Sequence, residues 1–388
     1  MLHLKNGRVF TMAEAGVIEN CDVLIEDGRI VAVGRELESC GEVIDMTGMC
    51  ILPGLVDAHS HIGGISMDGS FDSDFNEMTK PVTAELNVYD AIDPMNEGFR
   101  SAAARGITTS CIAPGSANVI GGWVIAAKSA GKSFADRVIK NPAALKGAMG
   151  INPKGVYAPK FMAPMTRMSI AETMREYLRK VKEYAQKKAE AGEDSSKLPP
   201  YDAAMEHGLP VIEKQIPLKV HSYQHDMMTV LEIAKEFDIL VTLDHAQGAT
   251  DFIDELAASE HLKGVVYGPI AMGLFPGEGC KIDYDAIKLL SERGVCTAVM
   301  TDGPLTNASI MVRSVGEAVR EGMDPLEALK TITVNAARII GCEERIGTIE
   351  VGKDADIAVF SAQPALDPRA AVVMTIIDGE IVYKRAGR

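Results

Sequence analysis

The chain has 388 residues, of which 47% are hydrophobic and 24% charged, and its net charge is −15. This composition is typical of a soluble globular protein with a large buried core. The negative charge argues against a nucleic-acid partner, which needs a basic surface, and against docking on an anionic membrane.

The sequence shows neither a recognisable targeting signal nor a pattern of paired cysteines. The first residues, MLHLKNGRVF, lack the apolar core of a signal peptide. No apolar run approaches the roughly 20 residues that span a bilayer. The seven cysteines are scattered and form no CxxC pair, so free thiols are expected. We therefore expect a cytoplasmic protein.

The two ends of the chain share a β-rich pattern. Residues 23–34, VLIEDGRIVAVG, hold two short apolar runs around Asp27-Gly28, which is typical of a hairpin. Near the C-terminus, residues 345–361 and 372–384 are β-branched runs punctuated by Gly and Asp-Gly. This shared composition predicts one small β domain that is built from both termini, residues 1–52 and 346–388.

The middle of the chain, residues 53–345, alternates short apolar strands with helical patterns. That alternation indicates a parallel sheet with helical crossovers. The predicted strands lie within residues 54–61, 106–114, 119–127, 143–150, 216–222, 239–246, 262–269 and 294–303. Eight such units predict a (β/α)8 barrel of the α/β class, whose catalytic residues lie at the carboxyl ends of the strands.

One segment interrupts this rhythm. Residues 166–197 form a long, highly charged helical pattern. Its mixture of charges indicates a solvent-exposed helical insertion. A role in covering the active site is the alternative.

A pair of histidines follows the first predicted barrel strand, in ILPGLVDAHSHIGG at residues 51–64. Alternate residues of a strand face the same side, so His59 and His61 point together, with Asp57 behind them. Two imidazoles that converge at the rim of a barrel suit a divalent metal ion. A pair of this kind is also compatible with ordinary core or surface histidines.

Three further residues occupy the equivalent place on other strands. His221 ends IPLKVH, His245 ends ILVTLDH and Asp302 ends VCTAVMTD. Four histidines and one carboxylate at the same depth of one barrel are hard to explain by packing alone, so they predict a metal centre.

The chain resembles the metal-dependent amidohydrolase superfamily, in the branch of imidazolonepropionase and related dipeptidases. The resemblance rests on Pro-Gly-Leu-Val-Asp-Ala-His-Ser-His at residues 53–61, Gly-Lys-Asp-Ala-Asp-Ile at 352–357 and Ile-Asp-Gly-Glu at 377–380. It implies a distorted (β/α)8 TIM barrel with a small β-sandwich domain. It also implies a set of metal ligands: His59, His61, His221, His245 and Asp302.

The resemblance implies a reaction as well. A metal held by imidazoles and a carboxylate lowers the pKa of bound water towards roughly 7. Asp302 is predicted to take the proton of that water and hand it to the leaving nitrogen. His245 is the histidine that would stabilise the developing oxyanion. We expect one or two divalent ions, zinc first, with iron or manganese as alternatives.

Two departures from the family pattern bear on the site. Binuclear members carry a bridging ligand on the fourth strand, and Lys146 is the candidate here, although it could be a plain solvated lysine. Relatives continue with Gly-Glu-Asn-Pro-Lys, whereas this chain has Ile151 in place of the glutamate. After His221 the run is Ser-Tyr-Gln-His-Asp, and Tyr223, Gln224 and His225 are candidates for substrate contact.

The predicted function is hydrolysis of a C–N bond in a cyclic amide, N-acyl or dipeptide-like small molecule. The alternatives are a heterocycle deaminase with the same fold and a metal-binding barrel that has lost catalysis. Retention of Asp302 favours a working enzyme. A homo-oligomer is left open.

Overall fold

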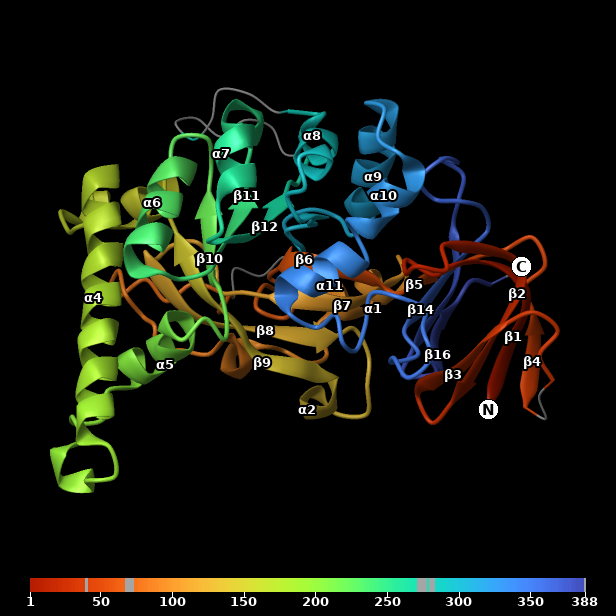
Figure 1. Cartoon of the computed structure of the whole chain (residues 1–388), viewed down its shortest axis with the longest axis horizontal. Coiled ribbons are helices and arrows are strands. Elements are labelled where there is room, and N and C mark those ends of the chain that lie inside the picture. The colour runs from red at the N-terminus through yellow and green to blue at the C-terminus, as the bar shows by residue number, and fades with distance from the viewer. Residues whose placement is uncertain (39–40, 67–72, 271–277, 279–282, 387–388) are drawn as a thin grey trace.

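The computed structural model describes the whole chain except residues 39–40, 67–72, 271–277, 279–282 and 387–388. Two sheets organise the described residues, and Figure 1 shows them side by side. One sheet forms a nearly closed barrel and the other joins the two ends of the chain. The predicted α/β fold, a distorted barrel with a terminal β domain, is confirmed.

The barrel sheet follows the chain in strict order. Its strands are β6 (Leu55–Ser60), β7 (Ile107–Ile112), β8 (Ile120–Lys128), β9 (Val138–Ala148), β10 (Leu218–Ser222), β11 (Val241–His245), β12 (Leu262–Tyr267) and β13 (Thr297–Val299). Each lies within or overlaps one of the predicted segments. A bridge between Ser60 and Gly303 brings the two edges together beyond β13.

One strand differs from the regular barrel pattern. β8 pairs antiparallel with both β7 and β9, while the other neighbouring strands run parallel. The chain passes from β7 to β8 through a short loop rather than a helical crossover, and an antiparallel pair needs no longer connection. This reversal is the distortion of the barrel.

The terminal sheet runs in the order β16-β15-β14-β5-β1-β2-β3, with β4 paired to β1. Its strands are β1 (Leu2–Phe10), β2 (Val17–Glu26), β3 (Arg29–Gly34), β4 (Glu42–Asp45), β5 (Cys50–Pro53), β14 (Ile357–Phe360), β15 (Val372–Ile377) and β16 (Glu380–Lys384). Strand β5 leads directly into β6, so this sheet fixes where the barrel begins. Its buried core includes Leu4, Val23, Ile51, Ile357 and Ile376.

Helices cover the outside of the barrel. They are α1 (Glu97–Ala103), α2 (Phe134–Arg137), α3 (Ile151–Tyr157), α4 (Arg167–Ala191), α5 (Ala203–Ile212), α6 (Met227–Phe237), α7 (Ile253–Ala258), α8 (Ala286–Glu292), α9 (Ile310–Arg320), α10 (Pro325–Lys330) and α11 (Val334–Ile340). In the described part of the chain, no helix is both long and apolar enough to cross a membrane.

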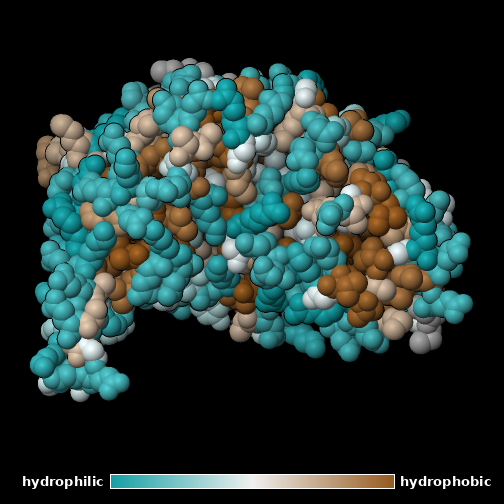
Figure 2. Space-filling model, in the orientation of Figure 1, coloured by the Kyte–Doolittle hydropathy of each residue, from teal (hydrophilic) through white to brown (hydrophobic). Residues whose placement is uncertain are grey.

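Helix α4 occupies most of the segment predicted to be a charged helix. Its inner face buries apolar side chains such as Met174, Leu178 and Val181, and it packs against α5 and α6. Its charged face points outward, and the end of α4 at the lower left of Figure 2 is mostly hydrophilic. Helix α4, which lies between β9 and β10 in the sequence, therefore contributes apolar side chains to the core as well as carrying solvent-exposed charge.

Candidate metal centre

The two ends of the barrel sheet place three polar side chains together. His59 lies near the end of β6, and His61 follows that strand directly. Asp302 follows β13, where its amide donates to the carbonyl of His59 at 3.1 Å, and the amide of His61 donates to Gly303 at 2.6 Å. These bonds join the first and last strands, so the closure of the barrel brings His59, His61 and Asp302 to one point.

The ligand atoms of this group converge. The Nε2 atoms of His59 and His61 are 3.3 Å apart. Asp302 Oδ1 lies 3.5 Å from the first and 3.3 Å from the second. All three side chains are buried, and Asp302 Oδ1 has no hydrogen-bond donor. Buried ligand atoms this close, with none donating to another, are the arrangement that a divalent cation would satisfy.

The opposite nitrogen of each imidazole is held by an acceptor. His61 Nδ1 donates to the Ala113 carbonyl at 2.7 Å, and His245 Nδ1 donates to the Gly268 carbonyl at 3.0 Å. His59 Nδ1 is in contact with the carboxylate of Asp244. Because these partners only accept, Nδ1 carries the hydrogen and the Nε2 lone pair faces the centre. Such partners are typical of metal-binding histidines.

Asp244 is itself fixed from two sides. Lys219 lies 2.8 Å from its Oδ2, and the hydroxyl of Thr242 donates to its Oδ1 at 3.1 Å. Asp244 and Lys219 are both buried. The chain from Lys219 through Asp244 to His59 therefore sets the orientation of the first ligand.

His221 and His245 complete the ring of imidazoles. The ring of His245 lies 5.2 Å from that of His59 and 4.3 Å from that of His221, measured between centroids. His221 is held differently: its Nε2 is 3.2 Å from the side-chain amide nitrogen of Asn152, and its buried Nδ1 makes no hydrogen bond to a described residue. Because the amide nitrogen donates, Nε2 accepts this bond and Nδ1 of the neutral ring carries the hydrogen, so the lone pair of His221 faces Asn152.

The protonation states suit metal binding. Burial, together with the nearby charges of Lys146 and other histidines, holds the pKa of His59 and His221 well below 6.5. Burial also lowers the pKa of His245. Burial alone would raise the pKa of Asp302, but the surrounding imidazoles of His61, His245 and His59 lower it overall. At neutral pH these groups are neutral imidazoles and a carboxylate, as ligands must be.

Lys146 lies on β9 beside this group. It pairs in register with Lys219 on β10, its side chain is fully buried, and its Nζ has no hydrogen-bond partner in the described part of the chain. Burial lowers the pKa of Lys146 to about 8. The structure thus places the predicted bridging residue inside the barrel rather than in solvent.

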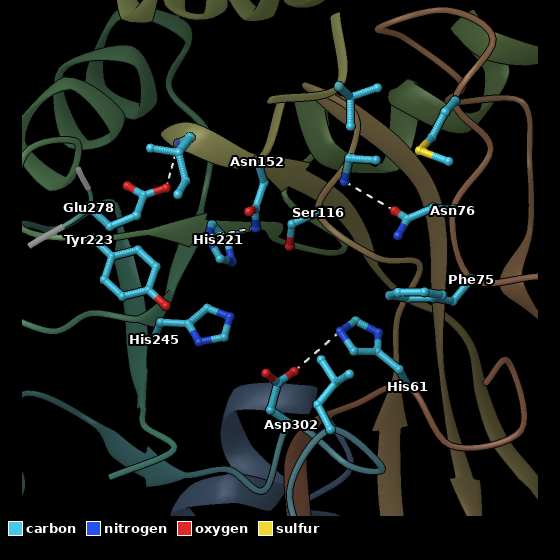
Figure 3. A pocket seen from close by; sticks show the side chains of 15 residues that line it. His61, Phe75, Asn76, Ser116, Asn152, His221, Tyr223, His245, Glu278 and Asp302 are labelled. Carbon is cyan, nitrogen blue, oxygen red and sulfur yellow. Dashed lines mark hydrogen bonds and ion pairs between the residues drawn. The ribbon is translucent and has the colours of Figure 1, made fainter. Parts of the chain in front are cut away.

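A cavity of about 470 Å³ opens above the centre. In Figure 3, His61, His245 and Asp302 point into it from below, Glu278, Tyr223 and Asn152 lie to one side, and Phe75 lies to the other. Tyr223, a predicted substrate contact, lines this cavity. Gln224 and His225 do not: the Gln224 side chain contacts Asp251, and His225 is exposed.

Several functional candidates were not predicted from the sequence. Asp244 adjoins His245 and Lys219 lies two residues before His221, so a polar residue inside an apolar strand was an available signal. Glu278 had no such signal, because it lies in the loop between β12 and α8, far in the sequence from every motif.

Sequence comparison finds amidohydrolases and imidazolonepropionases among the relatives of this chain. The profile of the Amidohydrolase family matches residues 50–382. An imidazolonepropionase from Thermoplasma acidophilum is 27% identical, with 96% of this chain and 92% of that protein covered. Amidohydrolase tasK from Hapsidospora irregularis is 26% identical over 92% of this chain, but this chain spans only 39% of that longer protein.

Comparison with solved structures also finds an amidohydrolase. The crystal structure of an amidohydrolase from Thermotoga maritima MSB8 matches with a TM-score of 0.94 and 36% identity, covering 99% of this chain and 100% of that one. An adenosine deaminase from Xanthomonas campestris with bound zinc matches with a TM-score of 0.56 and 18% identity, covering 98% and 92%. The second similarity shows a shared fold only.

Proposed function

Because this chain belongs to the amidohydrolase family, we propose that it is a metal-dependent hydrolase that cleaves a C–N bond of a small-molecule amide. The observation that carries the proposal is the convergence of His59, His61 and Asp302, with His221 and His245 beside them, at the floor of one cavity. The ligand atoms of His59, His61 and Asp302 all lie within 4.8 Å of one another and are buried, which fits a divalent cation. We propose zinc, which the similar deaminase structure contains.

The protein groups divide the reaction between them. When bound, the metal supplies an activated water and a positive charge beside the substrate carbonyl. Asp302 is held ionised, so it can accept the proton of that water and then deliver it to the leaving nitrogen. His245 lies on the adjacent wall, where it could stabilise the oxyanion as well as bind the metal.

Tyr223 supplies a further donor. Its ring stacks on His245 with centroids 5.5 Å apart, and its hydroxyl points into the cavity (Figure 3). Burial and the charges of Asp302 and Glu278 raise the pKa of Tyr223 well above its ordinary value. The hydroxyl therefore stays protonated and can donate to the carbonyl oxygen as negative charge develops on it.

Lys146 is proposed as a bridging ligand after carboxylation of its amine. The support is its place on the fourth strand, its full burial and its unpartnered Nζ. The amine must be neutral to react with carbon dioxide, and burial makes the neutral form accessible. A carboxylated Lys146 would favour a centre of two ions.

Amide hydrolysis is preferred to deamination. Imidazolonepropionases match this chain over nearly its whole length at 27% identity, whereas the deaminase structure is 18% identical. A heterocycle deaminase is the second candidate. Both reactions use the same activated water, so they differ in the substrate rather than in the centre.

Metal analysis combined with Asp302→Asn tests the proposal. We expect one or two equivalents of zinc in purified protein and a loss of kcat by about 10²–10⁴-fold in the variant on a substrate found by screening cyclic amides, N-acyl amino acids and dipeptides. Asp254→Asn is the matched control, since it alters an exposed ion pair with Arg293. Protein without stoichiometric metal, or full turnover by Asp302→Asn, contradicts the mechanism.

A further inference from the structure

We propose that Glu278 is a specificity-determining residue, which accepts a hydrogen bond from an amine or N–H group at the end of the substrate that is not cleaved. The inference rests on the proposed function, because it assumes that the scissile bond lies over the metal centre. It narrows the substrate class to small amides whose far end carries a hydrogen-bond donor rather than a carboxylate.

The first observation is the position of Glu278. Its side chain is only 1% exposed, yet it lines the cavity above Asp302 and His245. In Figure 3 it lies on the side of the cavity opposite Phe75, beyond Tyr223. The side chain therefore presents a buried carboxylate to the inside of the cavity, where a ligand would meet it.

The second observation is that Glu278 is held rigidly. One oxygen accepts from the amide of Ile151 at the start of α3, and the other lies 3.1 Å from Nη2 of Arg167 at the start of α4. These bonds come from two separate elements, so the carboxylate is fixed before any ligand arrives, as a recognition group should be. A carboxylate offers about four acceptor positions, which leaves capacity for a donor from the substrate.

The third observation is the local charge. Arg167 is shared: its Nε also lies 2.9 Å from Asp226 Oδ1, while the buried Oδ2 of Asp226 has no hydrogen-bond partner among the described residues. One guanidinium thus serves two buried carboxylates. Burial raises the pKa of both carboxyls overall, and the charge of Lys154, further along α3, opposes that rise without a described ion pair to either. A hydrogen-bond donor from the substrate would give these two carboxylates, which share Arg167, a further partner.

The fourth observation concerns the rest of the wall. No described residue that lines the cavity is a lysine or an arginine. In Figure 3 the side opposite Glu278 carries Phe75 and Asn76, and Met78 and Leu305 are further apolar residues that line the cavity. A ligand carboxylate would therefore lie beside Glu278 without a facing cation, whereas an ammonium or N–H group would find an acceptor.

Binding of hydroxamates to the metal-loaded protein tests the inference. Hydroxamates chelate active-site metals, and series of graded length can end in an ammonium, a methyl or a carboxylate group. In calorimetric titrations, we expect Glu278→Gln to weaken the best ammonium-tailed ligand by about tenfold, which is about 1.4 kcal/mol. The methyl-tailed ligand should change by less than about twofold, and the carboxylate-tailed ligand should bind more tightly.

Two further variants separate recognition from structure. Glu278→Asp keeps the charge and should retain the preference for the ammonium tail over the methyl tail, even if both bind more weakly. Glu85→Gln removes one charge from a residue that lines the neighbouring cavity and should leave all three ligands unchanged. Thermal unfolding and metal content are measured for every variant, so a folding defect is seen directly.

The outcomes are distinct. If Glu278→Gln weakens the ammonium-tailed and methyl-tailed ligands by the same factor, or if Glu85→Gln reproduces its effect, Glu278 is structural and the inference is wrong. If the methyl-tailed hydroxamate binds equally well after the metal is removed, the proposed metal chemistry fails instead, whatever the tails show.

Discussion

Two fully buried lysines on adjacent strands have opposite surroundings. Lys128, at the end of β8, lies 2.7 Å from Asp354, 3.0 Å from Asp356 and 2.5 Å from Asp378. Lys146, on β9, has no hydrogen-bond partner for its Nζ. Burial opposes the charge of both, but the three carboxylates raise the pKa of Lys128, while that of Lys146 falls to about 8.

The difference distinguishes Lys128, whose ion pairs hold the fold together, from Lys146, which is a candidate functional residue. The partners of Lys128 come from the Gly-Lys-Asp-Ala-Asp-Ile and Ile-Asp-Gly-Glu motifs, so these motifs tie the terminal sheet to the barrel. A paired buried charge needs nothing more. An unpaired buried amine beside a ring of histidines is costly to keep, and such groups are found at functional sites.

Loss of Lys128 should have the largest effect on stability. Lys128→Met removes the cation shared by three carboxylates, of which Asp354 keeps Arg29 and Arg345. Breaking a buried ion pair from one side costs about 3–5 kcal/mol of unfolding free energy. Urea denaturation measures it. Lys132→Met, on the exposed loop that follows, is the control and should be neutral. A stable Lys128→Met protein would show that the two lysines do not differ as described.

Lys146→Met should lower turnover rather than stability, in contrast to Lys128→Met. Methionine matches the length of the lysine and removes a buried amine without a partner, so the free energy of unfolding should stay the same or rise. Turnover should fall by at least about a hundredfold, since loss of even an outer partner of a metal ligand costs about 10–100-fold. Short carboxylic acids added to the variant should restore part of the activity. Unchanged turnover would mean that Lys146 is not a ligand.

The sequence predicted the barrel because each strand carries its own signal, a short apolar run, and some of these runs end in a chemically distinctive residue such as His221 or His245. It did not predict the reversal of β8, because strand direction depends on pairing between segments rather than on any one of them. The terminal β domain was predictable from its hairpin turns.

The part of the candidate site that lies at strand ends was predictable for the same reason as the strands themselves. Histidines at strand ends could be found one strand at a time. The partners of Lys128 could not, since Asp354 lies 226 residues away along the chain and only folding brings the two together. Glu278 lies in a loop and Asn152 in the first turn of α3, and both side chains are positioned by contacts that leave no periodic pattern in the sequence.

The Asp244 network should show a smaller effect on metal affinity. Asp244→Asn weakens the acceptor for the Nδ1 hydrogen of His59 and leaves Lys219 without its partner. We expect metal affinity, measured by competition with a chelator, to fall by about 10–100-fold while the fold is kept. Thr242→Val removes only the hydroxyl that donates to Asp244 and should cost less. Equal affinity in Asp244→Asn and wild type would exclude this orienting role.

The pH dependence of metal affinity should show the smallest effect and should separate Lys146 from the histidines. The lowered pKa values of His59, His221 and His245 mean that these imidazoles are already neutral at about pH 6.5, so protons compete little with the metal at these ligands. Lys146 binds a proton as the pH falls through about 8, and that proton must leave before the amine can be carboxylated.

Affinity for the second ion should therefore fall by about tenfold for each pH unit below about 8 in the wild type, because one proton competes for each ion bound. Affinity for the first ion, which needs only the histidines and Asp302, should stay nearly constant down to about pH 6.5. Chelator competition at several pH values, with bicarbonate present, measures both. Lys146→Met provides the decisive contrast: it should bind a single ion with the flat profile, and a steep profile in that variant would assign the titration to the histidines instead.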